Sequence, residues 1–148
     1  KNTDLKNYFP NDQINNGTEV SNTFLKVGSN GPKYGSSLVA SYSNYGKSTV
    51  DVFAPGSQIY STYPKESYEF ASGTSMACPA TAGVAALIRS YFPELSASEV
   101  REVLMATTAP YKKTVIAPNG EKAKMKDLCI TGGFVNAANA VAYLLEKK

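Results

Sequence analysis

The sequence of 148 residues contains no histidine. A serine hydroxyl normally needs a neighbouring base before it attacks a carbonyl carbon, so a nucleophilic serine here would lack its commonest activating group. The same absence, with only two cysteines, argues against a zinc site built from this chain. Two cysteines are also too few for a disulfide framework, and Cys78, which lies among small apolar residues, is predicted to be a buried structural thiol.

Long apolar runs are missing as well. No segment approaches the roughly 18 apolar residues needed to cross a bilayer, so we expect no membrane-spanning segment. The chain opens on the polar stretch KNTDLKNYFPND, without the apolar core of a signal peptide. Such an abrupt start is compatible with an excised or processed piece of a longer protein.

The net charge of +3 is spread along the chain, apart from a small group of lysines between Lys112 and Lys126. Because no arginine or aromatic residue is interleaved with them to stack on bases, this group is predicted to be a solvated loop and not a nucleic-acid site. A composition of 43% hydrophobic and 18% charged residues is typical of a globular chain. The length corresponds to about one domain.

Short strands are expected first and longer helices later. Residues 1–22 are predicted to be a loop, and strands are predicted at 23–27, 39–42, 50–54, 59–62 and 68–71. The dense apolar run that begins at 74 predicts a helix to about 91 that is buried on nearly every side. Ser96 and Glu99 form a capping box that opens a helix ending near 107. Residues 109–130 are predicted to be an exposed hairpin or loop with a turn at 119–120, and 136–146 a terminal helix.

Ser75 stands in the stretch GTSMACP, at the start of the first predicted helix. Amides in a first helical turn have no intrahelical partner, so the amide of Ser75 could stabilise a developing oxyanion, and the small residues Gly73 and Ala77 would leave room for a substrate backbone. Serine is also a common helix cap, and the local pattern alone favours that interpretation. The stretch lacks the second glycine of the GxSxG nucleophile elbow.

The wider sequence resembles the subtilisin-like serine proteases. GTSMACPATAGVAALI is similar to the serine motif of that family, usually GTSMAxPHxAGxxALL, and ASYSNYGKSTVDVFAPGSQIYST is similar to its SFSNYG...DVxAPGxxIxST segment. LKVGS at 25–29 resembles the ITVGA strand, and GGFVNAANAV at 132–141 resembles the closing GxGxVNAxxAV. The resemblance implies the C-terminal half of a three-layer α/β fold, with a mostly parallel sheet flanked by helices, over residues 1–148.

The resemblance also implies roles for individual residues. Ser75 would be the nucleophile and its amide one oxyanion donor, while Ser72, Gly73 and Thr74 would lie beside the scissile bond. Residues 8–10 (YFP) resemble a YPA turn that walls the substrate pocket, which gives Tyr8 and Pro10 that role. Asp51 matches an aspartate near a weak cation site in some members, although an aspartate entering a strand is more often a turn or capping ligand. Ala80 replaces a family histidine that is not the catalytic base, so its loss concerns packing.

In this family the catalytic order along the chain is aspartate, histidine, serine, so the base and its aspartate would lie upstream of Lys1. The second oxyanion donor, an asparagine in an AAGN segment, is expected there too. The parent would then be a secreted or periplasmic endopeptidase that cleaves polypeptides through an acyl-enzyme on Ser75. It would need no cofactor, with calcium as a structural ion at most.

On this hypothesis the isolated chain would be inactive, and it would associate with the missing N-terminal half or with itself through an exposed sheet edge. The alternative is a catalytically dead subtilase-like domain that binds or scaffolds.

Overall fold

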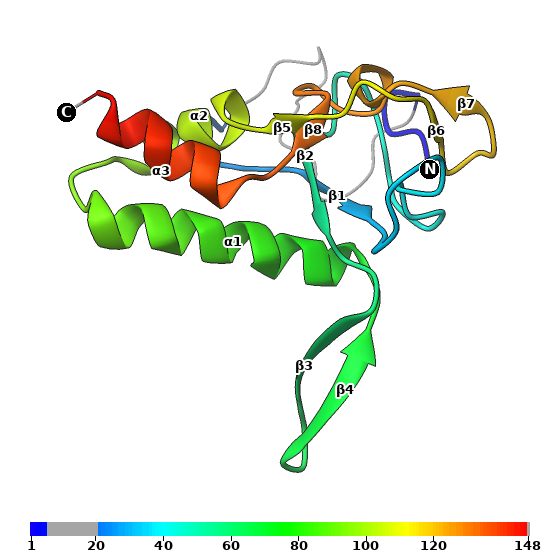
Figure 1. Ribbon diagram of the computed structural model, residues 1–148, viewed down its shortest axis with the longest axis horizontal. Coiled ribbons are helices and arrows are strands. Elements are labelled where there is room, and N and C mark those ends of the chain that lie inside the picture. The colour runs from blue at the N-terminus through cyan, green and yellow to red at the C-terminus, as the bar shows by residue number, and fades with distance from the viewer. Residues whose placement is uncertain (6–20, 148) are drawn as a thin grey trace.

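The computed structural model describes residues 1–5 and 21–147 (Figure 1). Its elements follow the expected order, with strands first and the long helix in the middle of the chain. They are β1 (Val27–Asn30), β2 (Val52–Pro55), β3 (Ile59–Tyr63), β4 (Ser67–Ala71), α1 (Thr74–Tyr91), α2 (Ala97–Ala106), β5 (Ala109–Pro110), β6 (Val115–Ile116), β7 (Lys122–Ala123), a 3-10 helix (Met125–Asp127), β8 (Gly133–Phe134) and α3 (Ala137–Leu145).

The central sheet has the strand order β1-β2-β8-β5. β1 is parallel to β2 and β2 to β8, whereas β5 runs antiparallel to β8. The residues of β2 are apolar and buried from Val52 to Ala54, as expected of a strand covered on both faces. The chain therefore has an α/β fold with a mostly parallel sheet, and the predicted fold class is confirmed.

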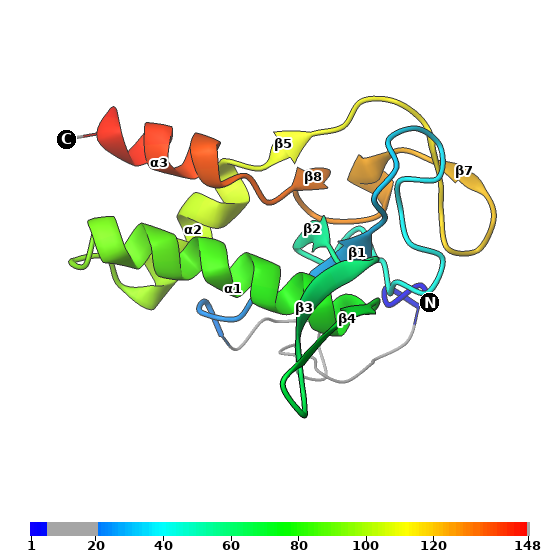
Figure 2. The same cartoon turned by 60° about the horizontal axis from the view of Figure 1, so that its bottom comes forward.

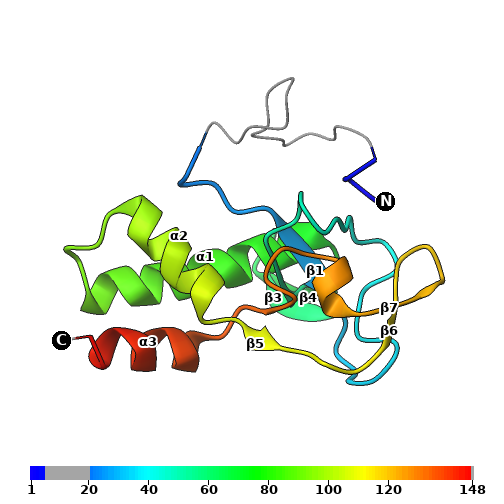
Figure 3. The ribbon, with the colours of Figure 1, turned by 90° about the horizontal axis from the view of Figure 1, so that it is seen from above.

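The three helices gather at one end of the sheet (Figures 2 and 3). α1 contacts β1, β2, α2 and α3. The core between the helices is built from aliphatic and aromatic side chains that include Ile88, Phe92, Val103, Leu104 and Leu144. α2 begins at the predicted capping box, in which the Ser96 hydroxyl accepts from the Glu99 amide and the Glu99 carboxylate accepts from the Ser96 amide at 2.7 Å.

A second core lies under the β6–β7 hairpin and is centred on Phe53, Val115, Met125 and Leu128, which are at most 2% exposed. Its existence corrects the prediction of an exposed segment at 109–130. The segment does contain a hairpin, but alternate residues point inward against β2, which periodicity over two-residue strands is too short to show.

The predicted strand at 39–42 is also wrong. Val39 makes a single antiparallel bridge to Asn30, and the chain turns away at once. The strand predicted at 23–27 begins only at Val27, because β2 offers its first partner there, Val52. The strands predicted at 50–54, 59–62 and 68–71 form within two residues of their expected bounds.

α1 is buried on one face only. Ala77, Thr81 and Ile88 are buried against the sheet and the other helices, whereas Cys78 and Leu87 are exposed. The prediction of burial on nearly every side, and of a buried Cys78, is therefore wrong for the chain as it stands. The outer face still consists mainly of apolar residues, so α1 presents an apolar surface that no described residue covers.

A buried ion pair joins the sheet to α2. Asp51 is completely buried and lies 3.2 Å from the guanidinium of Arg101, which also donates to the carbonyl of Phe24 at 2.9 Å. The other carboxylate oxygen of Asp51 accepts from the Lys26 amide at 2.7 Å. These bonds fasten the start of β2 to the chain that enters β1.

Replacing Arg101 by methionine keeps most of the side-chain volume but removes the guanidinium that lies 3.2 Å from the buried Asp51 carboxylate. We expect Arg101→Met to lower the free energy of unfolding by about 3–5 kcal/mol. Urea denaturation followed by circular dichroism measures this. Arg89→Met is the matched control, because Arg89 is exposed and donates only to the Leu95 carbonyl. Equal stability of the two variants would contradict the role given to the pair.

Candidate active site

Ser75 lies in the first turn of α1 with its side chain exposed to solvent. The N-cap of this helix is Gly73, which has an extended backbone (φ 162°, ψ 164°) and no side chain to cap with. The interpretation of Ser75 as a helix cap is therefore wrong. Its hydroxyl makes no hydrogen bond to any of the described residues, so it is available for other chemistry.

The amides around Ser75 are also available. The Gly73 carbonyl accepts from the amides of Met76 at 3.0 Å and Ala77 at 3.3 Å. The amides of Thr74 and Ser75 have no acceptor in the part of the chain that the structure describes. They lie at the positive end of an 18-residue helix, where partial positive charge favours an anion.

The turn before Ser75 is fixed by the loop that follows β2. The Gly56 carbonyl accepts from the Gly73 amide at 2.7 Å, and the Gly56 amide donates to the Asn30 carbonyl at 3.1 Å. A Cβ atom on residue 56 would lie 2.6 Å from the Gly73 carbonyl oxygen and 3.0 Å from the Ala77 Cβ, so only glycine allows this approach. Ala77 is completely buried, so its small side chain makes room for Gly56 and does not face a substrate, contrary to expectation.

Tyr42 completes the support of this turn. Its hydroxyl donates to the Gly56 carbonyl at 2.9 Å and lies 2.7 Å from the Ser57 hydroxyl and 3.0 Å from the Ser29 hydroxyl. The carbonyl that receives Gly73 is therefore also held by Tyr42. Sequence reasoning missed this residue, because the contact joins segments that are 14 residues apart and no local pattern marks it.

Ser72 is turned toward the base of the β3–β4 hairpin, where its hydroxyl accepts from the Gln58 amide at 2.8 Å. The hairpin projects away from the sheet (Figure 1). One of its faces carries Tyr60, Tyr68 and Phe70, which are between 59% and 71% exposed. The centroid of the Tyr60 ring lies 5.6 Å from that of Tyr68 and 4.9 Å from that of Phe70. Ser72, Gly73, Thr74 and Ser75 thus form one continuous segment between the hairpin and α1.

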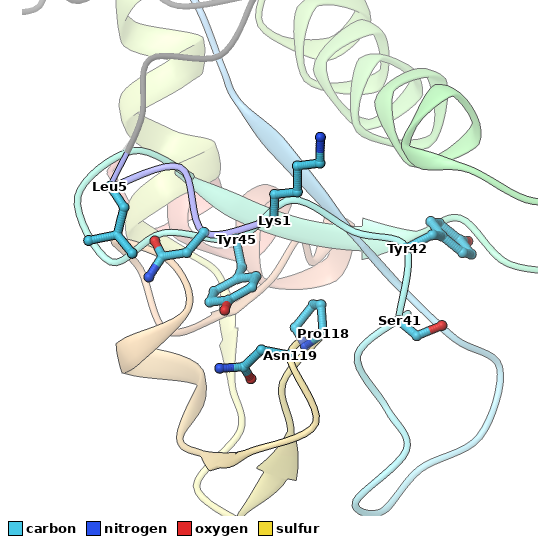
Figure 4. A pocket seen from close by; sticks show the side chains of 8 residues that line it. Lys1, Leu5, Ser41, Tyr42, Tyr45, Pro118 and Asn119 are labelled. Carbon is cyan, nitrogen blue, oxygen red and sulfur yellow. The ribbon is translucent and has the colours of Figure 1, made fainter.

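A cavity of about 540 Å³ lies beyond Tyr42, toward the N-terminus (Figure 4). Its lining includes Lys1, Leu5, Tyr45, Pro118 and Asn119. Tyr42 also lines this cavity, in addition to its hydrogen bond to the Gly56 carbonyl. Tyr8 and Pro10, to which the family resemblance assigns a pocket wall, lie outside the described residues.

Asp51 is engaged by Arg101 and the Lys26 amide, so an internal cation already neutralises the carboxylate considered for a weak cation site. No group of three or more carboxylate, thiol or imidazole side chains that could hold a metal ion occurs in residues 1–5 and 21–147. The geometry around Ser75 therefore offers a hydroxyl and two amides, and the chain has no imidazole to act as the base.

Comparison with known proteins places the chain in a family. The sequence model of the subtilase family, peptidase family S8, matches residues 8–133. The chain belongs to the subtilase family. It is homologous to serine peptidases, and the resemblance noted in the sequence is confirmed.

Individual relatives agree. Subtilisin DY of Bacillus licheniformis is 53% identical over 68 residues, which are 46% of this chain and 24% of that protein. Thermitase of Thermoactinomyces vulgaris is 54% identical over 68 residues and 23% of its own length. Subtilisin-like protease 2 of Plasmodium falciparum is 37% identical over 109 residues, 70% of this chain and 7% of that protein. The chain thus spans about a quarter or less of these subtilases.

Solved structures show the same fold. A chain from the subtilase cytotoxin SubAB assembly matches with a TM-score of 0.65 at 24% identity, over 83% of this chain and 37% of its own. The A-subunit of the AB5 toxin from E. coli matches with a TM-score of 0.64 over 80% of this chain and 37% of its own. No helix in the described part of this subtilase chain is both long and apolar enough to cross a membrane.

Removing the Tyr42 hydroxyl tests the support of the turn. We expect Tyr42→Phe to lower the free energy of unfolding by about 0.5–1.5 kcal/mol, the usual contribution of one hydrogen bond. Thermal or urea denaturation measures the loss. Tyr34→Phe is the control, because Tyr34 is 88% exposed. An unchanged stability of the Tyr42 variant would show that the turn is held without this hydroxyl.

Proposed function

We propose that this chain is the C-terminal part of the catalytic domain of a serine endopeptidase of the subtilisin type, in which Ser75 is the nucleophile. The observation that carries the proposal is the position of Ser75 in the first turn of α1: among residues 1–5 and 21–147 its exposed hydroxyl has no hydrogen-bond partner, and the two amides beside it have no acceptor. The N-cap residue, Gly73, has no side chain and so does not obstruct the approach to the Ser75 hydroxyl.

In the proposed reaction the Ser75 Oγ bonds to the carbonyl carbon of the scissile peptide and its proton passes to a base. The carbonyl oxygen becomes negative and accepts a hydrogen bond from the Ser75 amide, at the positive end of α1. The amine product leaves with that proton, and water then releases the acyl group from Ser75. The segment 72–74 lies along the substrate.

The base must come from outside this chain, because the chain has no histidine. The family order of aspartate, histidine and serine assigns the imidazole, its aspartate and the second oxyanion donor to residues upstream of Lys1. The 148 residues alone are therefore inactive as a protease. The chain spans only 24% of Subtilisin DY, which leaves ample length in such a protein for these groups.

A catalytically dead member with a binding role is the second candidate, and the missing histidine is the observation that favours it. Both candidates bind polypeptides. Only the first requires a base near Ser75 in the full-length protein, so reactivity of Ser75 there decides between them. We propose an extracytoplasmic location for either, by analogy with the family.

We further propose that the remainder of the domain covers the outer face of α1. The small exposed residues of this face permit close approach of another element, and Leu87 adds apolar surface; the small residues are Cys78, Pro79, Ala82, Gly83 and Ala86. The outer edge of β1 has fewer free hydrogen-bonding groups, because Ser29 and Gly31 on this edge already bond to residues 38–43. Self-association by strand addition there would find few free groups, so the helix face is the better route to association.

Labelling with a fluorophosphonate tests the catalytic proposal. We expect the full-length protein to be labelled at Ser75 and the 148-residue chain to remain unlabelled, since losing the base costs about six orders of magnitude in turnover. Ser75→Ala should abolish labelling, whereas Ser61→Ala, the matched control at an exposed serine of β3, should retain it. A full-length protein that folds and hydrolyses no peptide, with Ser75 unlabelled, would favour the binding role.

Thiol reactivity tests the proposed coverage of α1. In the 148-residue chain, an aromatic disulfide reagent should react readily with exposed Cys78 and slowly with Cys129, because burial raises the pKa of the Cys129 thiol. In the full-length protein Cys78 should become protected. Rapid reaction of Cys78 in both would contradict coverage of this face. Cys78→Ala serves as the control that assigns the fast phase.

A further inference from the structure

One segment of the chain carries a net positive charge equal to that of the whole chain. Residues 112–127 contain five lysines and two acidic residues, a net charge of +3 that equals the net charge of the whole chain. The remaining residues therefore sum to zero. The fold gathers part of this charge around a hollow that the proposed protease function does not use.

This hollow has a volume of about 390 Å³, room for roughly a dozen water molecules. Three lysines line it, Lys112 after β5 and Lys124 and Lys126 after β7, together with Tyr111, Thr131 and Gly132. The residues come from three separate segments at the end of the molecule that carries the β6–β7 hairpin (Figure 3). It is concave, which distinguishes it from lysines scattered on a flat surface.

The walls are fixed by bonds to the core. The Tyr111 ring packs edge-on against Phe134, with centroids 6.2 Å apart, and its hydroxyl accepts from the Gly35 amide at 3.2 Å. The Thr131 hydroxyl donates to the Asp51 carbonyl at 2.9 Å. Gly132 has a φ of +64°, and a Cβ atom there would lie 3.1 Å from the Lys126 Cα. Glycine at 132 thus allows the Lys126 backbone to close the hollow.

The three ammonium groups are not neutralised. Lys124 Nζ donates to the Lys112 carbonyl at 3.2 Å, which holds one positive charge against a neighbouring segment. Within the described residues no carboxylate lies within 4.0 Å of the Lys112, Lys124 or Lys126 ammonium. The nearby Asp127 carboxylate accepts from the Lys124 backbone amide at 3.3 Å instead. The hollow therefore holds excess positive charge.

We propose that this hollow binds a small molecule that carries a multivalent phosphate group. Lysine ammonium groups are point charges that suit phosphate oxygens, and a charge of about −2 on a phosphate monoester matches three cations better than a single carboxylate does. The concave shape favours a small ligand over a polymer. Tyr111 and Pro110 add an apolar wall for the rest of the molecule.

The site is remote from Ser75 and independent of the proposed protease function. Thr131 bonds to Asp51, at the beginning of β2, whereas Ser75 lies beyond the carboxyl end of that strand. Binding therefore leaves the serine accessible, and a binding assay reports on the hollow whether or not the protein hydrolyses peptides.

Isothermal titration of the full-length protein with pyrophosphate tests the proposal. We expect one saturable site whose affinity falls as salt is raised. The triple variant Lys112→Gln, Lys124→Gln, Lys126→Gln should bind at least about tenfold more weakly, because it removes the charges that face the ligand. The matched control is Lys33→Gln, Lys47→Gln, Lys65→Gln, which lowers the net charge equally at exposed lysines outside the hollow; it should bind like the parent.

Three outcomes would overturn the proposal: no saturable binding by the parent, equal weakening in both triple variants, or tighter binding of a glutamate-rich peptide than of pyrophosphate. Sedimentation with vesicles that contain phosphatidic acid separates a free ligand from a lipid headgroup. Binding to vesicles without binding to pyrophosphate would also overturn it. Unchanged circular dichroism of both variants shows that the fold is retained.

Discussion

The hydrogen bond from the Gly73 amide to the Gly56 carbonyl, 2.7 Å long, is the contact on which the geometry around Ser75 depends. It ties the start of α1 to the end of β2, a strand that is buried in the centre of the sheet. Because residue 56 has no side chain, the strand end and the helix start can approach to this distance. Ser75 is thus carried on a helix whose start is hydrogen-bonded to the end of a buried strand.

The exposed apolar surfaces of α1 and of the β3–β4 hairpin have a common explanation. A helix as apolar as α1 is stable when both of its faces are covered, yet the described residues cover one face only. The aromatic face of the β3–β4 hairpin is exposed in the same way. The hairpin and the helix flank the segment 72–75. The chain spans about a quarter of Subtilisin DY, so most of such a protein lies outside it. Coverage of the helix face by the rest of a catalytic domain, as proposed, would bury apolar surface and complete the site in one step.

Local features were predictable from the sequence, and contacts between distant segments were not. The capping box at Ser96 follows from side chains three residues apart, and the strands β3 and β4 from their β-branched and aromatic residues. Tyr42 could not be found, because its hydroxyl acts on a carbonyl in another loop. The burial of Met125 and Val115 was missed for the same reason: their segment is short and polar in sequence, and the fold places it over Phe53. The roles of Ser75 and its neighbours remain predictions.

The most direct measurement is a crystal structure of the full-length protein after inhibition by a peptidyl phosphonate. If Ser75 is the nucleophile, phosphorus will be bonded to its Oγ, with one phosphonyl oxygen about 2.7–3.1 Å from the Ser75 amide nitrogen. A histidine from the preceding part of the chain will lie beside Oγ. An adduct on any other residue, or a phosphonyl oxygen directed away from the amino end of α1, would contradict the account.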